Sequence, residues 1–75
     1  MPIIKIEVTR EGVSREQKRA LIKGVTDLVT EVLNKDPQLT HVVINEVELD
    51  NWGYGGEQVS VLREHGITAD KRKPS

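Results

Sequence analysis

The first residues of the chain offer one unusual chemical group. The chain opens "MPIIKIEV", so Pro2 directly follows the initiator methionine and leads into an apolar stretch. If Met1 is removed, Pro2 presents a secondary amine that its ring holds nearly rigid. An α-amino group titrates at about 7.7–8.0 in model peptides, and an apolar site or nearby cations lower that pKa. Such an amine can act as a general base and acid. Alternatively, Pro2 only begins a strand, where its missing N–H does no harm.

The amino-acid composition limits which other functions the chain can have. There is no cysteine, and the two histidines, His41 and His65, are far apart and lack the spacing of metal ligands. The net charge is −1, and one Trp, one Tyr and no Phe give no row of aromatic side chains. Nucleic acid is therefore not an expected partner. No apolar run is long enough to span a membrane and the N-terminus lacks signal-peptide features, so we expect a soluble cytoplasmic protein.

The chain length predicts one small domain whose hydrophobic core needs additional stabilisation. A core formed by 75 residues seldom supplies more than about 3–5 kcal/mol. Disulfides are excluded by the absence of cysteine, and no metal site is indicated. Oligomerisation is the support that remains, so we expect a homo-oligomer.

Three segments must position Pro2. Residues 3–9 alternate apolar and polar side chains and favour a strand. Residues 15–34 carry apolar side chains at spacings of three and four, which predicts a helix. Ser14 and Gln17 form a capping-box pattern at its start, and "NKDP" indicates its end. Residues of about 40–48, "THVVINEVE", predict a second strand.

The remaining residues are less regular. "DNWGYGGE" breaks the periodicity, "QVSVLRE" predicts a short final strand or a hairpin arm, and "HGITADKRKPS" is a polar, basic tail. We therefore expect a domain over residues 2–64 and a mobile tail over 65–75. One weaker hypothesis is that the tail docks on an acidic partner.

The order strand, long helix, strand predicts an α/β protomer. A crossover of this length joins parallel strands into a βαβ unit. One helix covers only one face of a two-stranded sheet, and two strands are fewer than a sheet normally needs in water. A second copy that extends the sheet to four strands would solve this problem.

The order and spacing of several segments resemble the 4-oxalocrotonate tautomerase family of the tautomerase superfamily. These segments are the opening proline with its alternating strand, the helix entry "SREQKRALI", the strand end "INEV" and the loop "NWGYGGE", and the similarity covers about residues 2–63. The resemblance implies a βαβ protomer, a dimer around a four-stranded sheet, and a hexamer of three dimers. It implies that Pro2 moves a proton in a small enol or unsaturated keto acid, without cofactor or metal.

The resemblance also implies residues that bind the substrate. The family carries an arginine for the substrate carboxylate just after the turn glycine, but here Val13 follows Gly12 and the turn is one residue longer. Arg10 or Arg15 could replace it, and Arg10 is preferred because it ends the strand that Pro2 begins. His41 is the nearest match to a second family arginine, or is a plain strand-edge residue.

Trp52 matches the aromatic residue that the family places ahead of its glycine-rich loop. An apolar wall there would exclude water and keep the pKa of the amine low. Equally, Trp52 could fill a contact between subunits.

Three functions remain open. The first is a proline-dependent tautomerase acting on a small carboxylate or enol. The second is a non-catalytic oligomeric interaction domain on the same scaffold, suggested by Val13. The third is a related hydratase or dehalogenase, which would need water activation and more than one cation.

Overall fold

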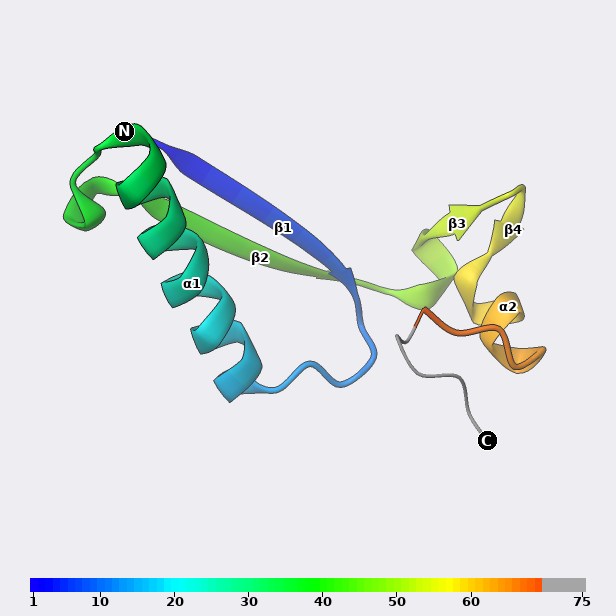
Figure 1. The fold of residues 1–75 in the computed structure, drawn as a ribbon. Coiled ribbons are helices and arrows are strands. Elements are labelled where there is room, and N and C mark those ends of the chain that lie inside the picture. The colour runs from blue at the N-terminus through cyan, green and yellow to red at the C-terminus, as the bar shows by residue number, and fades with distance from the viewer. Residues whose placement is uncertain (70–75) are drawn as a thin grey trace.

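The computed structural model describes residues 1–69. Figure 1 shows a two-stranded sheet with one long helix beside it and a small arm beyond the end of the second strand. In chain order the elements are β1 (Ile3–Thr9), α1 (Arg15–Leu33), a 3₁₀ turn (Pro37–Leu39), β2 (His41–Val47), a second 3₁₀ turn (Leu49–Asn51), β3 (Gly53–Tyr54), β4 (Glu57–Gln58) and α2 (Val59–Glu64).

The strands β1 and β2 are parallel, which confirms the predicted βαβ unit. Their register pairs Ile3 with His41 at one end and Thr9 with Val47 at the other. In both strands half-buried residues alternate with exposed ones, as the alternating sequence pattern of β1 predicts. The second strand is slightly shorter than the predicted range of about 40–48.

Helix α1 begins and ends at the predicted signals. The Gln17 N–H donates to the Ser14 hydroxyl at 3.1 Å, and the Ser14 N–H donates to Gln17 Oε1 at 2.9 Å, which completes the capping box. Asn34 closes the helix in the left-handed conformation, with φ of 53°. The helix therefore ends one residue earlier than the range 15–34.

The C-terminal arm combines a hairpin with a short helix. Strands β3 and β4 are antiparallel, and Gly55 and Gly56 form the turn between them with positive φ angles of 64° and 84°. The expected C-terminal hairpin is thus confirmed. The segment "QVSVLRE" is not a strand beyond Gln58, because Val59–Glu64 form α2. A stretch of six residues is too short for its apolar pattern to separate a helix from a strand.

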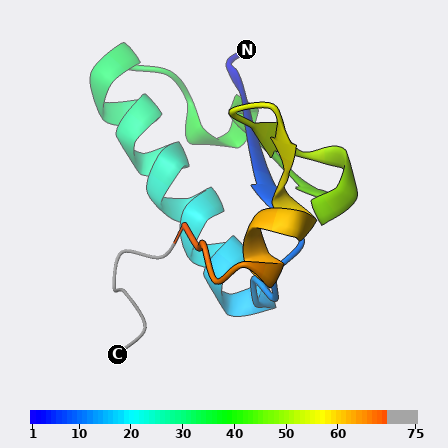
Figure 2. The same cartoon turned by 90° about the vertical axis from the view of Figure 1, so that its right-hand side faces the viewer.

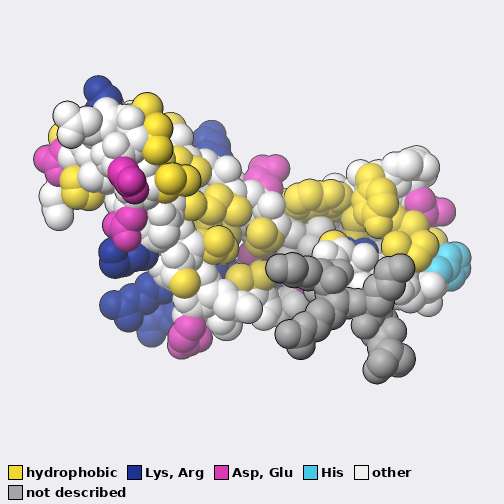
Figure 3. Space-filling model, in the orientation of Figure 1, with side chains coloured by type: hydrophobic (Ala, Val, Ile, Leu, Met, Phe, Trp, Pro, Cys, Tyr) yellow, Lys and Arg dark blue, Asp and Glu magenta, His cyan; other side chains and the backbone are white. Residues whose placement is uncertain are grey.

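The protomer lacks a closed core. Val59 is the sole hydrophobic residue that is fully buried within residues 1–69, and no residue of α1 is buried. The radius of gyration is 15.5 Å, whereas a compact domain of this length would have about 11 Å. Figure 1 shows the arm set apart from α1 beyond the end of the sheet, Figure 2 shows the arm in front of the sheet with α1 beside it, and Figure 3 shows hydrophobic side chains exposed along the flank of α1 and over the arm.

The division into a domain over 2–64 and a tail over 65–75 stays a prediction. Residues 67–69 follow α2 without helix or strand. The "DKRKPS" part of the tail lies outside the described residues.

Candidate active site

Pro2 lies at the start of the sheet. It immediately precedes β1 and is half-buried, while Met1 before it is 82% exposed. The Pro2 carbonyl accepts a hydrogen bond from the His41 N–H at 3.0 Å. The backbone of β2 therefore fixes the proline, and His41 lies beside it on the neighbouring strand. While Met1 is attached, the Pro2 nitrogen is an amide and is not basic.

Arg10 and Trp52 lie at the opposite end of the sheet. Arg10 follows β1 and donates its N–H to the Val47 carbonyl at 2.8 Å. Arg10 lies eight positions after Pro2 along an extended chain, which corresponds to about 26 Å. Trp52 comes five residues after the end of β2. Within one chain, the four predicted site residues thus lie toward two ends of the sheet, with Pro2 and His41 at one end and Arg10 and Trp52 toward the other.

Arg10 belongs to a small charged cluster. Its Nε lies 2.6 Å from Glu48 Oε1, and its Nη1 lies 3.9 Å from Glu46 Oε2. Lys18 of α1 forms a second ion pair with Glu46. The Lys18 hydrogen bond, aided by the charges of Lys18 and Arg10, holds the pKa of Glu46 below its usual value. The two cations and two carboxylates balance, so Arg10 is positioned but has no surplus charge around it.

An ion pair that the sequence did not suggest connects the turn after β1 to the arm. Arg63 of α2 donates from Nε to Glu11 Oε2 at 2.8 Å and from Nη2 to Glu11 Oε1 at 3.1 Å. Thr9 donates its hydroxyl to the same carboxylate. The hydrogen bond from Arg63 is the main cause of the lowered pKa of Glu11, and the hydrogen bond from Thr9 lowers it further. The hydrogen bond to Glu11 in turn raises the pKa of Arg63. The partners are 52 residues apart, and no local pattern signals such a contact.

Trp52 is tied to the arm. It is half-buried, and its carbonyl accepts a hydrogen bond from the Val59 N–H at 2.7 Å. Because Val59 is 1% exposed, this contact anchors the indole-bearing residue to the best-packed point of the arm. The arm thus sets the position of Trp52.

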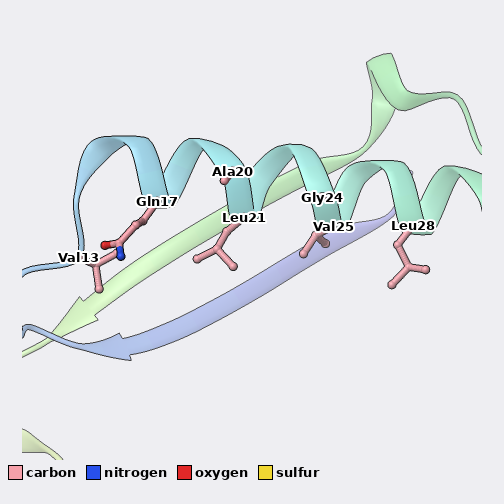
Figure 4. Close-up of a pocket in the computed structure, with 7 residues that line it drawn as sticks. All are labelled: Val13, Gln17, Ala20, Leu21, Gly24, Val25 and Leu28. Carbon is pink, nitrogen blue, oxygen red and sulfur yellow. The ribbon is translucent and has the colours of Figure 1, made fainter. Parts of the chain in front are cut away.

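Val13, which follows Gly12 in the turn before α1, lines an open apolar groove along the helix. The groove has a volume of about 650 Å³. Figure 4 shows its lining side chains along one side of the helix: Val13, Gln17, Ala20, Leu21, Gly24, Val25 and Leu28. Arg15, the other proposed replacement, is exposed in the first turn of α1 and forms no ion pair within residues 1–69.

Two other features are absent from the described part of the chain. No three His, Asp or Glu side chains gather there as metal ligands. None of the helices in residues 1–69 is both long and apolar enough to cross a membrane.

Comparisons with known proteins agree with this architecture. The family model described as "Tautomerase enzyme" matches residues 2–62. Probable tautomerase K2 of Dickeya dadantii (strain 3937) is 52% identical over 64 residues, covering 85% of this chain and 96% of that protein. A probable tautomerase of Helicobacter pylori (strain ATCC 700392 / 26695) is 47% identical over 66 residues, covering 85% of this chain and 97% of that protein.

Solved structures show the same fold. The crystal structure of DmpI from Helicobacter pylori superimposes with a TM-score of 0.79 at 46% identity, over 84% of this chain and 97% of that one. A 4-oxalocrotonate tautomerase isozyme from Methylibium petroleiphilum gives a TM-score of 0.80 at 26% identity, over 85% of this chain and 98% of that one. The family model covers most of the chain, and the two curated relatives match it over 85% of its length. The chain therefore belongs to the tautomerase family.

Proposed function

We propose that this protein is a tautomerase in which Pro2, exposed by removal of Met1, transfers a proton within a small enol or unsaturated keto acid. The observation that carries the proposal is the position of Pro2 in a chain of this family. The residue is half-buried at the end of the sheet and is held by the 3.0 Å bond from His41. A rigidly held amine needs little reorganisation during proton transfer.

The reaction requires two proton transfers on the substrate. The neutral Pro2 amine removes a proton from a hydroxyl group or a carbon atom and becomes a secondary ammonium. The ammonium then returns a proton to another carbon, which moves the double bond and regenerates the amine. An amine whose pKa lies near the working pH performs both steps.

Substrate binding falls to Arg10, His41 and Trp52. Arg10 would bind the substrate carboxylate, and His41 would polarise a carbonyl or pair with a carboxylate beside Pro2. Trp52 would form the apolar wall. With Val13 in place of the family arginine, a monocarboxylate or a neutral enol suits the site better than a dicarboxylate, which needs two cations.

Pro2 and Arg10 can act on the same small molecule only if copies of the chain assemble. Pro2 and Arg10 are about 26 Å apart along β1, so one protomer cannot present both to a small molecule. The exposed hydrophobic surface and the absence of a closed core support assembly. The family resemblance suggests a hexamer built from three dimers.

Enzyme assays test the proposal directly. Processed protein and the Pro2→Ala variant are compared for ketonisation of phenylpyruvate enol and of 2-hydroxymuconate. The Pro2→Ala variant should lose most of the activity, because a primary amine on a flexible residue replaces the rigid secondary amine. Equal rates for the two proteins would refute proline catalysis.

A non-catalytic interaction domain is the second candidate. The charge-balanced cluster around Arg10 and the apolar side chain of Val13 favour it, because neither leaves an unpaired cation for a substrate. Absence of tautomerase activity in protein with a free Pro2 amine would support this candidate. Hydration or dehalogenation of an unsaturated acid is the third, and the same protein would be assayed for it.

A further inference from the structure

The side chain of Arg63 in α2 joins the C-terminal arm to the end of β1. Its Nε and Nη2 groups donate to the two carboxylate oxygens of Glu11, and its Nη1 group donates to the Ile67 carbonyl at 2.9 Å. Thr9, the last residue of β1, donates its hydroxyl to the same carboxylate. One arginine is therefore bonded to the turn after β1 and to the segment that follows α2.

Geometry and burial distinguish this ion pair from an ordinary surface pair. The Arg63 side chain is 14% exposed and makes two bonds to one carboxylate. By contrast, Lys23 and Asp27 on α1 share a single bond, and their side chains are 75% and 62% exposed. Exposed pairs of this second kind contribute little, whereas a two-bond arginine–carboxylate pair also fixes an orientation. The Glu11–Arg63 pair can therefore hold two segments in one relative position.

Other contacts do little to fix the orientation of the arm. Helix α2 packs mainly on the 3₁₀ turn Leu49–Asn51 and on β4, and Figure 1 shows the arm set beyond the end of the sheet. Within residues 1–69, the bonds to Glu11 are the only side-chain hydrogen bonds that join the arm to β1 or the turn after it. Segments with little buried surface open easily. The orientation of the arm thus depends strongly on this one ion pair.

The same ion pair connects two residues to which the proposed function assigns the substrate. Glu11 directly follows Arg10 in the chain. Arg63 lies one helical turn after Val59, and the Val59 N–H donates to the Trp52 carbonyl at 2.7 Å. The links on both sides of the pair are short, so its two bonds determine where Trp52 lies relative to Arg10.

We propose that Glu11 and Arg63 are positioning residues of the active site. Their ion pair holds the arm against the end of β1, so that Trp52 and Arg10 keep a fixed separation that suits one small substrate. The two charged groups bond to each other and act on the substrate only through Trp52 and Arg10. This inference rests on the proposed function, because that function gives Trp52 and Arg10 their roles.

Loss of the ion pair should weaken substrate binding more than proton transfer. Without it, the arm must be ordered each time a substrate binds, and ordering mobile groups on binding reduces affinity. The proton transfer by Pro2 uses neither charged group. Arg63→Gln and Glu11→Gln should therefore each raise KM by at least about 5-fold and lower kcat by a smaller factor.

Trp52 reports its own surroundings, because it is the only tryptophan of the chain. Its side chain belongs to a half-buried residue in the wild type. In Arg63→Gln its fluorescence should shift to longer wavelength, and acrylamide should quench it more strongly. Arg63→Lys keeps the charge but cannot form the two parallel bonds, so it should show both changes to a smaller extent. This measurement does not depend on enzyme activity.

The double variant Glu11→Gln/Arg63→Gln tests whether the two residues act as one pair. Its KM should lie within about 2-fold of that of the more affected single variant, because the second change removes nothing further. Lys23→Gln and Asp27→Asn are the matched controls, since they make the same kinds of change in the exposed pair on α1. Both controls should keep the wild-type KM and the wild-type Trp52 fluorescence.

Circular dichroism and sedimentation at the assay concentration select the variants that keep the wild-type helix content and assembly. If Arg63→Gln does not fold, Glu11→Gln and Arg63→Lys carry the test. Wild-type KM and Trp52 fluorescence in these variants would overturn the proposal. A double variant whose rise in KM equals the product of the two single effects would also overturn it, because the residues would then act independently.

Failure of this proposal can be told apart from failure of the proposed function. If the wild type has no tautomerase activity but the fluorescence of Trp52 responds to both single variants, the ion pair positions the arm and the proposed function fails. If the wild type is active but neither KM nor the fluorescence responds, the positioning role fails and the proline chemistry remains.

Discussion

Gly24 separates the stability of one protomer from the stability of the assembly. It lies in the middle of α1, lines the apolar groove, and a Cβ added to it would meet no atom within 4 Å in the protomer. Gly24→Leu replaces a poor helix former with a good one, which stabilises a helix by about 0.8 kcal/mol. For a lone domain of this size the melting temperature would rise by roughly 3–6 °C.

In the assembly, Gly24→Leu should be destabilising. If the α1 helix of a second copy fills the groove, the leucine side chains occupy space that the two helices need. Overpacking costs about 1–3 kcal/mol per site, and the twofold symmetry makes two such sites in each dimer. At the lower limit the two sites together cost roughly 2 kcal/mol. Because 1.4 kcal/mol corresponds to a factor of ten, the dissociation constant of the dimer should rise by at least about 30-fold.

Sedimentation and thermal unfolding, each over a range of protein concentration, measure both effects. Arg19→Leu is the control, since it adds the same side chain to an exposed position on the far side of α1. The account predicts weaker assembly of Gly24→Leu and unchanged assembly of Arg19→Leu. A higher melting temperature of Gly24→Leu with unchanged assembly would refute the reasoning, because it would show that nothing packs on this groove.

Three further changes test other parts of the account. Glu11→Gln removes a carboxylate whose pKa is lowered mainly by the hydrogen bond from Arg63. The stability that this carboxylate gives the wild type is present above about pH 4.5 and is lost as the pH falls through the lowered pKa. The variant should therefore be less stable than the wild type at pH 7, and its stability should fall less on acidification. A variant with the wild-type acid profile would contradict this role. Val59→Ala removes the one fully buried hydrophobic side chain of residues 1–69 and should cost roughly 1.5–3 kcal/mol in chemical denaturation, whereas an unchanged midpoint would show that the arm does not contribute. Arg10→Ala should raise KM for a carboxylate substrate more than it lowers kcat, and an unchanged KM would remove Arg10 from substrate binding.

The sequence predicts most of the βαβ unit because its signals are local. Alternation in residues 3–9 and the capping box of Ser14 and Gln17 lie within single elements, and the structure confirms both. Helix α2 was missed because six residues do not separate a helical period from an alternating one. The pair Glu11–Arg63 was missed because its partners are 52 residues apart and each is an ordinary surface residue in the sequence.

The candidate site was predictable only as a set of residues. Pro2 is marked by its position after Met1, and Trp52 by the glycines that follow it. Their arrangement was not predictable, because both ends of β1 belong to one strand in sequence but are about 26 Å apart in space. The structure therefore changes the question from which residues form the site to which copies supply them.

The most direct test of the account is the titration of the Pro2 nitrogen in processed protein, followed by NMR of the ¹⁵N-labelled chain after intact mass has shown that Met1 is absent. The account predicts a pKa below that of a free proline amine, because an apolar wall and an arginine disfavour the charged form. A pKa equal to that of the free amine, or a mass that shows Met1 retained in protein from its own cell, would contradict the account.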